Sequence, residues 1–118
     1  MTFSVDKFMH RQFHIQNYNC WDFIREVWLE LAGRDIGHRT PEVATQLAMR
    51  RRFDREEREF VKLAAPEDPC IVLMRRVKGT PHVGIFYKKK VLSIDERGVT
   101  YFPLNVATAG FKSVGFYR

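Results

Sequence analysis

Long apolar runs are missing from this chain. No stretch of about 18 consecutive apolar residues is present, so the sequence predicts no transmembrane helix. The first 16 residues, MTFSVDKFMHRQFHIQ, hold no apolar core and no small-residue cleavage site, which excludes a secretory signal peptide. We therefore expect synthesis in the cytosol, and any release to a cell wall or a virus particle would need another route.

Cysteines and cofactor motifs are also scarce. Cys20 and Cys70 are too few for a disulfide framework, and both are expected to be reduced. His10 and His14 lie four positions apart, but no Glu or Cys completes a metal-ligand set at a useful spacing. The glycines form no phosphate-binding loop. We expect neither a metal nor a cofactor.

What the chain does contain is typical of one folded domain, expected over residues 1–118. Its 118 residues are 45% hydrophobic and 14% aromatic, which excludes a disordered chain. The 20 basic and 14 acidic residues give a formal charge of +6, which suggests an anionic partner. The charge is scattered, however, because the basic run 50–52 is followed at once by acidic residues and 88–90 is expected at a hairpin tip. Nucleic acid is therefore not the favoured partner.

Hydrophobic spacing predicts helices first and strands afterwards. Apolar residues recur at three- and four-residue spacing over 20–32, with Asn19 as N-cap and Gly33 as the stop. Two more helices are expected, at 40–50 and 54–63. Strands are expected at 70–77, 82–87, 91–95, 99–102 and 112–117. This order predicts an α+β fold with N-terminal helices packed on an antiparallel sheet of about five strands.

Cys20 is the candidate nucleophile because it falls in the first turn of the expected helix. Unpaired backbone N–H groups and the helix dipole favour a thiolate there, by roughly 0.3–1 kcal/mol. A nucleophilic thiolate at neutral pH normally needs an imidazole as well. Position alone also fits a small buried hydrophobic residue, which is the role expected for Cys70.

His82 is the natural partner for Cys20. It opens an expected strand directly after Pro81, where a side chain can face a cleft. Gly84 lies on the same strand face and is expected to leave open space for a substrate. A histidine satisfied by hydrogen bonds in the core or at the surface is the alternative interpretation.

The next strand offers two groups that could orient the imidazole. If Phe86 pairs with Val91, Asp95 lies opposite His82 and Ser93 is its diagonal neighbour. Asp95 is the better orienter, because a carboxylate holds one imidazole tautomer and stabilises the imidazolium. Ser93 could do so only weakly, and both residues could also belong to a solvated strand face.

Five short segments carry a family likeness: NCWDFI at 19–24, PHVGIFY at 81–87, VLS at 91–93, GVT at 98–100 and GFYR at 115–118. In this order, over most of the chain from about Tyr18 onward, they resemble the NlpC/P60 superfamily, and its short phage-associated members most of all. The resemblance implies a papain-like fold, with the nucleophile at a helix start and the histidine on the first strand of a hairpin.

The resemblance also implies an activity. Cys20 matches the family's nucleophile and His82 its general base, and the implied enzyme is a cysteine peptidase or amidase acting on the stem peptides of peptidoglycan. Ser93 falls where the family usually carries His, Asn or Gln, so either Asp95 takes that role or the pair works with weak orientation. The alternatives are a non-catalytic papain-like module that binds peptide or glycan, and a structural component that contacts other phage tail proteins.

Overall fold

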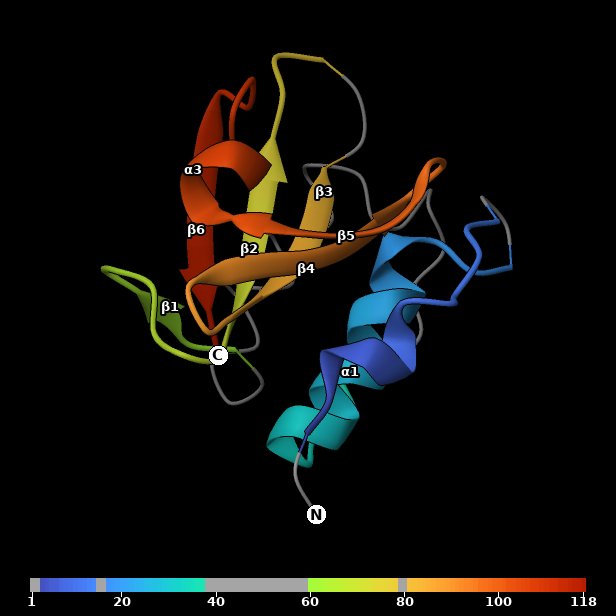
Figure 1. The fold of residues 1–118 in the computed structure, drawn as a ribbon. Helices are drawn as coiled ribbons and strands as arrows, with labels where there is room; N and C mark the ends of the chain where they lie inside the picture. Colours follow the sequence, from blue (N-terminus) through green and yellow to red (C-terminus); the bar gives the residue numbers. More distant parts are fainter. Residues whose placement is uncertain (1–2, 15–16, 38–59, 79–80) are drawn as a thin grey trace.

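The computed structural model describes residues 3–14, 17–37, 60–78 and 81–118, and it confirms an α+β fold (Figure 1). Its sheet has six antiparallel strands, in the order β1-β6-β2-β3-β4-β5, where about five were expected. The elements are η1 (Val5–Phe8), α1 (Cys20–Ala32), β1 (Lys62–Leu63), β2 (Cys70–Arg75), β3 (His82–Tyr87), β4 (Lys90–Asp95), β5 (Gly98–Pro103), α3 (Leu104–Ala107) and β6 (Ser113–Tyr117).

Helix α1 forms where its sequence predicts it, because both of its ends are encoded locally. The Asn19 side chain accepts hydrogen bonds from the backbone N–H groups of Trp21 and Asp22, at 2.9 and 3.2 Å. The Asp22 carboxylate accepts the Asn19 N–H in return, at 3.1 Å, which completes a capping box. Gly33 ends the helix in the left-handed region, with φ +71°. The helix start at Cys20 is therefore held firmly.

The expected helices at 40–50 and 54–63 fall largely outside the described residues. Where the second of them reaches described residues, the prediction is wrong, because Lys62 and Leu63 form strand β1. They pair with Tyr117 and Phe116 of β6, a partner far along the chain that no local pattern reveals. The five strands that were expected are all present, with ends shifted by one or two residues.

Side chains pack on both faces of the sheet. Helix α1 lies against β3 and β4 on one face, and Figure 1 shows α3 at the other side of the sheet, beside β6 and β2. The main core, on the α1 face, includes Trp21, Phe23 and Ile85, each at most 1% exposed. A smaller cluster on the opposite face joins Val72 to residues of α3 and β6. The sheet is thus covered by apolar side chains on both faces, and β3 contributes to each.

No helix in the described part of the chain combines the length and the apolar character that a bilayer-spanning segment needs.

Candidate functional site

The Cys20 sulfur lies against the first residues of β3. Cys20 is half-buried, and backbone hydrogen bonds reach its sulfur from Val83, from Trp21 and from Cys20 itself. The pairs of β3 with β4 run from Tyr87↔Lys90 to Ile85↔Leu92, whereas its pairs with β2 continue to Met74↔His82. At this end of the hairpin the Val83 backbone is free to bind the sulfur. The fold therefore brings the thiol to the residue that follows His82.

The electrostatic setting of Cys20 differs from the expectation for a helix start. Burial raises the pKa of the Cys20 thiol above its ordinary value, and the Asp22 charge adds to this. The backbone hydrogen bonds lower the pKa, but burial outweighs them. The N–H groups of the helix start thus act in the expected direction, but they do not offset burial of the thiol.

The His82 imidazole lies on the other face of β3 from the α1 core. Its ring stacks on Phe111, with centroids 6.2 Å apart and planes 9° from parallel. The Arg76 guanidinium carbon lies over the Phe111 ring, 4.4 Å from its centroid. Burial lowers the pKa of His82 to about 4, the Asp95 carboxylate opposes this, and Arg76 and Arg97 add to it. The imidazole is therefore neutral at neutral pH and able to accept a proton.

Asp95 acts on His82 through its charge. The printed β3–β4 pairs end at Ile85↔Leu92, so the expected pairing of Asp95 with His82 stays a prediction, but Asp95 is close enough for its charge to act on the imidazole. Its carboxylate is nevertheless held by Arg97, which donates from the guanidinium at 2.8 Å and from the backbone at 2.9 Å. These bonds hold the pKa of Asp95 below its ordinary value, and His82 contributes only through its charge.

Ser93 lies on β4 two residues before Asp95, close to Gly84 of β3. Its hydroxyl is buried and shares a hydrogen bond of 3.2 Å with the Thr100 hydroxyl on β5. Ser93 therefore lies close to the strand that carries His82, but its hydroxyl is hydrogen-bonded to Thr100 and not to the imidazole.

The open space expected beside Gly84 is not there. A Cβ on Gly84 would lie 2.7 Å from Val91 Cγ1 and 3.2 Å from Ser93 Cβ. Glycine is required at position 84 because β4 approaches β3 closely there. Atoms of β4 fill the space that was expected to be open to a substrate.

Cys70 lies in the core, where the sequence suggested it. Cys70 is fully buried in β2, burial raises the pKa of its thiol to about 11, and both cysteines are free thiols. Among the described residues no cluster of His, Cys, Asp and Glu has the geometry for a metal ion. Phe111 and Arg76 were not among the candidates, because only tertiary packing brings them to His82 and no local pattern marks them.

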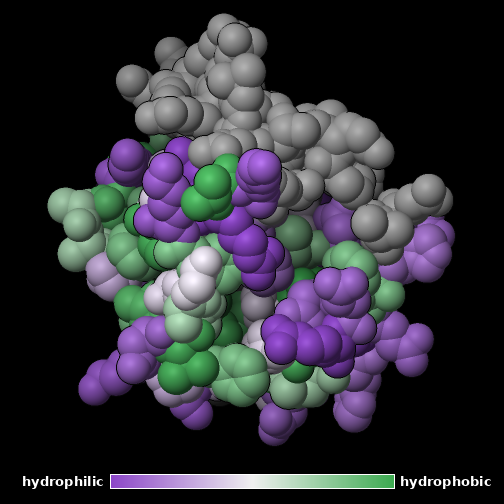
Figure 2. All heavy atoms as spheres, turned by 90° about the horizontal axis from the view of Figure 1, so that it is seen from above, coloured by the Kyte–Doolittle hydropathy of each residue, from purple (hydrophilic) through white to green (hydrophobic). Residues whose placement is uncertain are grey.

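The surface around the site is mixed in character. Figure 2 shows hydrophilic side chains in separate groups, with hydrophobic surface between them. Exposed apolar side chains include Phe102 and Val106, at 46% and 53% exposure.

Comparisons with protein-family models, with curated proteins and with solved structures find no match to this chain.

Proposed function

We propose that this protein is a cysteine peptidase or amidase of the NlpC/P60 type, with Cys20 as nucleophile and His82 as general base. The proposal rests on one observation above all: the Cys20 sulfur binds the backbone of Val83, next to His82, although the two residues are far apart in the sequence. Thiol acyl transfer needs a helix-start thiol close to an imidazole, and the position of Cys20 against the start of β3 supports this, although the His82 ring lies on the other face of that strand.

The chemistry starts from a neutral pair. His82 takes the Cys20 proton as the sulfur attacks an amide carbonyl carbon, and backbone N–H groups at the start of α1 are suited to hold the oxyanion. The C–N bond breaks and the imidazolium returns the proton to the leaving amine. Water, deprotonated by His82, then cleaves the thioester, and the proton goes back to the sulfur. The Asp95 charge favours the imidazolium in both halves of the reaction.

The substrate that fits the family likeness is the peptide stem of peptidoglycan. This assignment comes from the resemblance, together with a positive net charge that suits an anionic wall. Release to a cell wall, or attachment to a phage tail, belongs to the same proposal.

A second candidate function is a papain-like module that binds peptide or glycan without cleaving it. Two observations favour it: burial moves the pKa values of Cys20 and His82 in the directions that oppose an ion pair, and Arg97 holds the Asp95 carboxylate.

Digestion of purified peptidoglycan separates the two candidates. We expect the protein to release new amino groups, Cys20→Ser to reduce the rate about 100-fold or more, and Cys70→Ser to leave it unchanged. The Cys70 variant is the matched control because it changes the other free thiol. If the Cys20→Ser variant still released amino groups at the wild-type rate, the proposal that Cys20 is the nucleophile would be contradicted. Binding to peptidoglycan in a pull-down, equal for wild type and Cys20→Ser and without amino-group release, would favour the binding module.

A further inference from the structure

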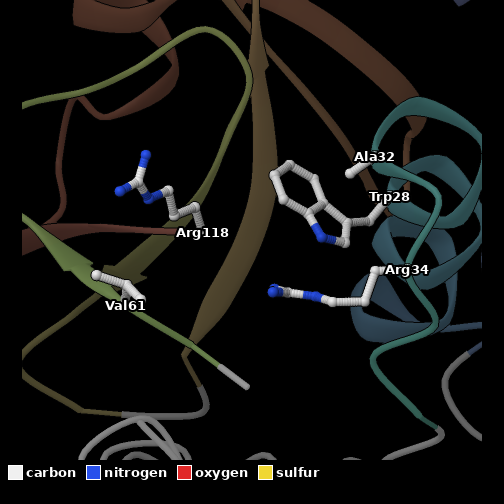
Figure 3. A pocket seen from close by; sticks show the side chains of 5 residues that line it. All are labelled: Trp28, Ala32, Arg34, Val61 and Arg118. Atoms are coloured by element: carbon white, nitrogen blue, oxygen red, sulfur yellow. The ribbon is translucent and has the colours of Figure 1, made fainter. Parts of the chain in front are cut away.

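A hollow of about 230 Å³ lies beside the C-terminal half of α1, away from Cys20. Its volume equals that of roughly seven or eight water molecules in the liquid. Figure 3 shows Trp28 and Arg34 on one side of it, and Val61 and Arg118 on the other; Ala32 completes the lining. Because α1 rises about 1.5 Å per residue, Trp28 is roughly 12 Å along the helix from Cys20. The hollow is thus separate from the proposed active site.

Three hydrogen-bond donors at this hollow are buried and have no partner among the described residues. They are the indole Nε1 of Trp28 and the Nε and Nη2 atoms of Arg34. Trp28 is only 4% exposed, and Figure 3 shows its ring nitrogen on the edge that faces the Arg34 side chain. Buried donors are nearly always satisfied in folded proteins, so this group of three indicates a ligand.

The two Arg34 atoms make up one edge of its guanidinium, which matches a carboxylate in two-point contact. The same edge of Arg25 binds the Asp35 carboxylate at 2.7 and 3.0 Å, and that of Arg11 binds Glu26 at 3.3 and 3.0 Å. The same edge of Arg97 binds the Asp95 carboxylate as well, so among the described residues this edge of three other arginines binds a carboxylate.

Apolar contacts hold the Arg34 guanidinium in place. Its carbon lies 5.9 Å from the Trp28 ring centroid and 5.6 Å from that of Phe60. Arg118 brings a second positive charge, although its Nη1 also lies 3.3 Å from Glu67. The hollow thus combines a fixed fork of donors with apolar walls, as small-molecule sites do.

We propose that this hollow binds a small organic acid, with its carboxylate on Arg34 and Trp28 and its apolar body against the indole ring and Val61. This site is independent of the proposed peptidase function.

Benzoate is a suitable probe, read out by the indole N–H signals in a ¹⁵N–¹H NMR spectrum. The chain has two tryptophans, and the indole of Trp21 already donates to the Gly37 carbonyl at 2.6 Å, so it serves as an internal reference. We expect benzoate to move the Trp28 signal saturably while the Trp21 signal stays in place, and Trp28→Phe assigns the signals. Benzamide, which has the same shape without the charge, is expected to leave both signals unmoved. No saturable shift with benzoate, or equal shifts with benzamide, would overturn the proposal.

Two variants test the fork itself. Arg34→Lys keeps the charge but removes the two-point contact, and we expect it to weaken benzoate binding about tenfold or more. Arg25→Lys changes a fork that Asp35 already fills and is expected to leave binding unchanged. Equal affinity of wild type and Arg34→Lys, in a protein whose spectrum shows it folded, would contradict the assignment.

A third experiment distinguishes a free small acid from an acidic side chain of a partner protein as the group that Arg34 binds. N-acetyl-glutamate amide carries the carboxylate of a protein side chain, and we expect it to bind more weakly than benzoate because it lacks a ring to pack on Trp28. Tighter binding of this compound would overturn the small acid in favour of an acidic side chain of a partner protein.

Discussion

Burial decides the protonation of both candidate catalytic groups. The thiol of Cys20 and the imidazole of His82 are each moved toward their neutral forms, since charge is costly to hold away from water. The helix start and the Asp95 charge act in the other direction but are weaker. Any proton transfer between the two groups would therefore start from a neutral thiol and a neutral imidazole.

Phe111 is expected to set the pKa of His82 by excluding water from its ring. Phe111→Ala opens that face of the imidazole, so the pKa should rise from about 4 toward the ordinary value, by about one unit or more. Arg76→Gln should raise the pKa by less, because it removes only a nearby charge. Both shifts can be measured by NMR titration of the imidazole Hε1 signal. Phe111→Leu is the control, since it keeps an apolar cover, and a pKa that stays at about 4 in Phe111→Ala would contradict this account.

Individual residues show how far sequence reasoning reaches. The position of Cys20 at a helix start follows from local spacing, and the structure has it. The hydrogen bonds of Asp95 to Arg97 and the packing of Val91 against Gly84 depend on side-chain conformations. No pattern of residue types contains that information.

Among the elements, the β3–β4 hairpin carries local strain. Its two turn residues, Lys88 and Lys89, have φ values of +50° and +69°, a region that residues with a Cβ adopt at a cost. Tight two-residue hairpin turns need positive φ at both positions, which Asn-Gly supplies most readily. The position of this turn can be predicted from the sequence, but lysine is poorly suited to the positive φ that both turn positions adopt.

Relief of this strain should stabilise the protein. We expect Lys88→Asn with Lys89→Gly to raise the free energy of unfolding by about 1 kcal/mol, measured by urea denaturation. The bond from the Lys88 backbone N–H to Asp68, 3.0 Å, does not depend on the side chain and should persist. Lys90→Gly is the control, because Lys90 lies in β4 and loses strand propensity without gaining a turn residue. Lower stability of the turn variant would show that the lysine side chains matter more than the backbone.

Elements with local signals were predicted well, and those without were missed. Helix α1 carries its own cap and stop, and strands β3, β4 and β5 follow one another through short turns. Strand β1 has only two residues and exists because β6 pairs with it. Its neighbouring residues read as a helix because nothing nearby in the sequence encodes that pairing.

For the molecule as a whole, two apolar clusters share one sheet. Strand β2 is buried over Cys70–Met74, so its continuous apolar run serves the main core on one face and the smaller cluster on the other. His82 is set among these side chains, with its ring on the side of the smaller cluster. A buried titratable group at such a place couples its protonation to the stability of the entire fold.

Stability is therefore expected to fall as pH decreases from about 6.5 to about 4. In this window the unfolded chain takes up a proton on His82 that the folded protein, with a pKa of about 4, does not. The loss in the free energy of unfolding is on the order of 3 kcal/mol, measurable by urea denaturation at a series of pH values. Asp95 and Asp35, whose pKa values lie below the ordinary carboxylate value, act only below this window.

The variant His82→Phe keeps an aromatic ring on Phe111 and removes the titration, so this part of the pH dependence should disappear. His10→Gln, at an exposed position, should retain it. A His82→Phe protein with the same loss of stability between these pH values would assign the effect to other groups.

The sheet also has a consequence for how the chain matures on the ribosome. Strand β6 follows β2, β3, β4 and β5 in synthesis, yet it lies between β1 and β2. Until it emerges, the nascent hairpins expose an unpaired edge of β2 together with apolar side chains on both of its faces, a surface that invites wrong pairing. Closure of the sheet therefore depends on a strand that is made after its neighbours, and we expect the free edge of β2 to be the place most prone to wrong pairing until β6 joins it.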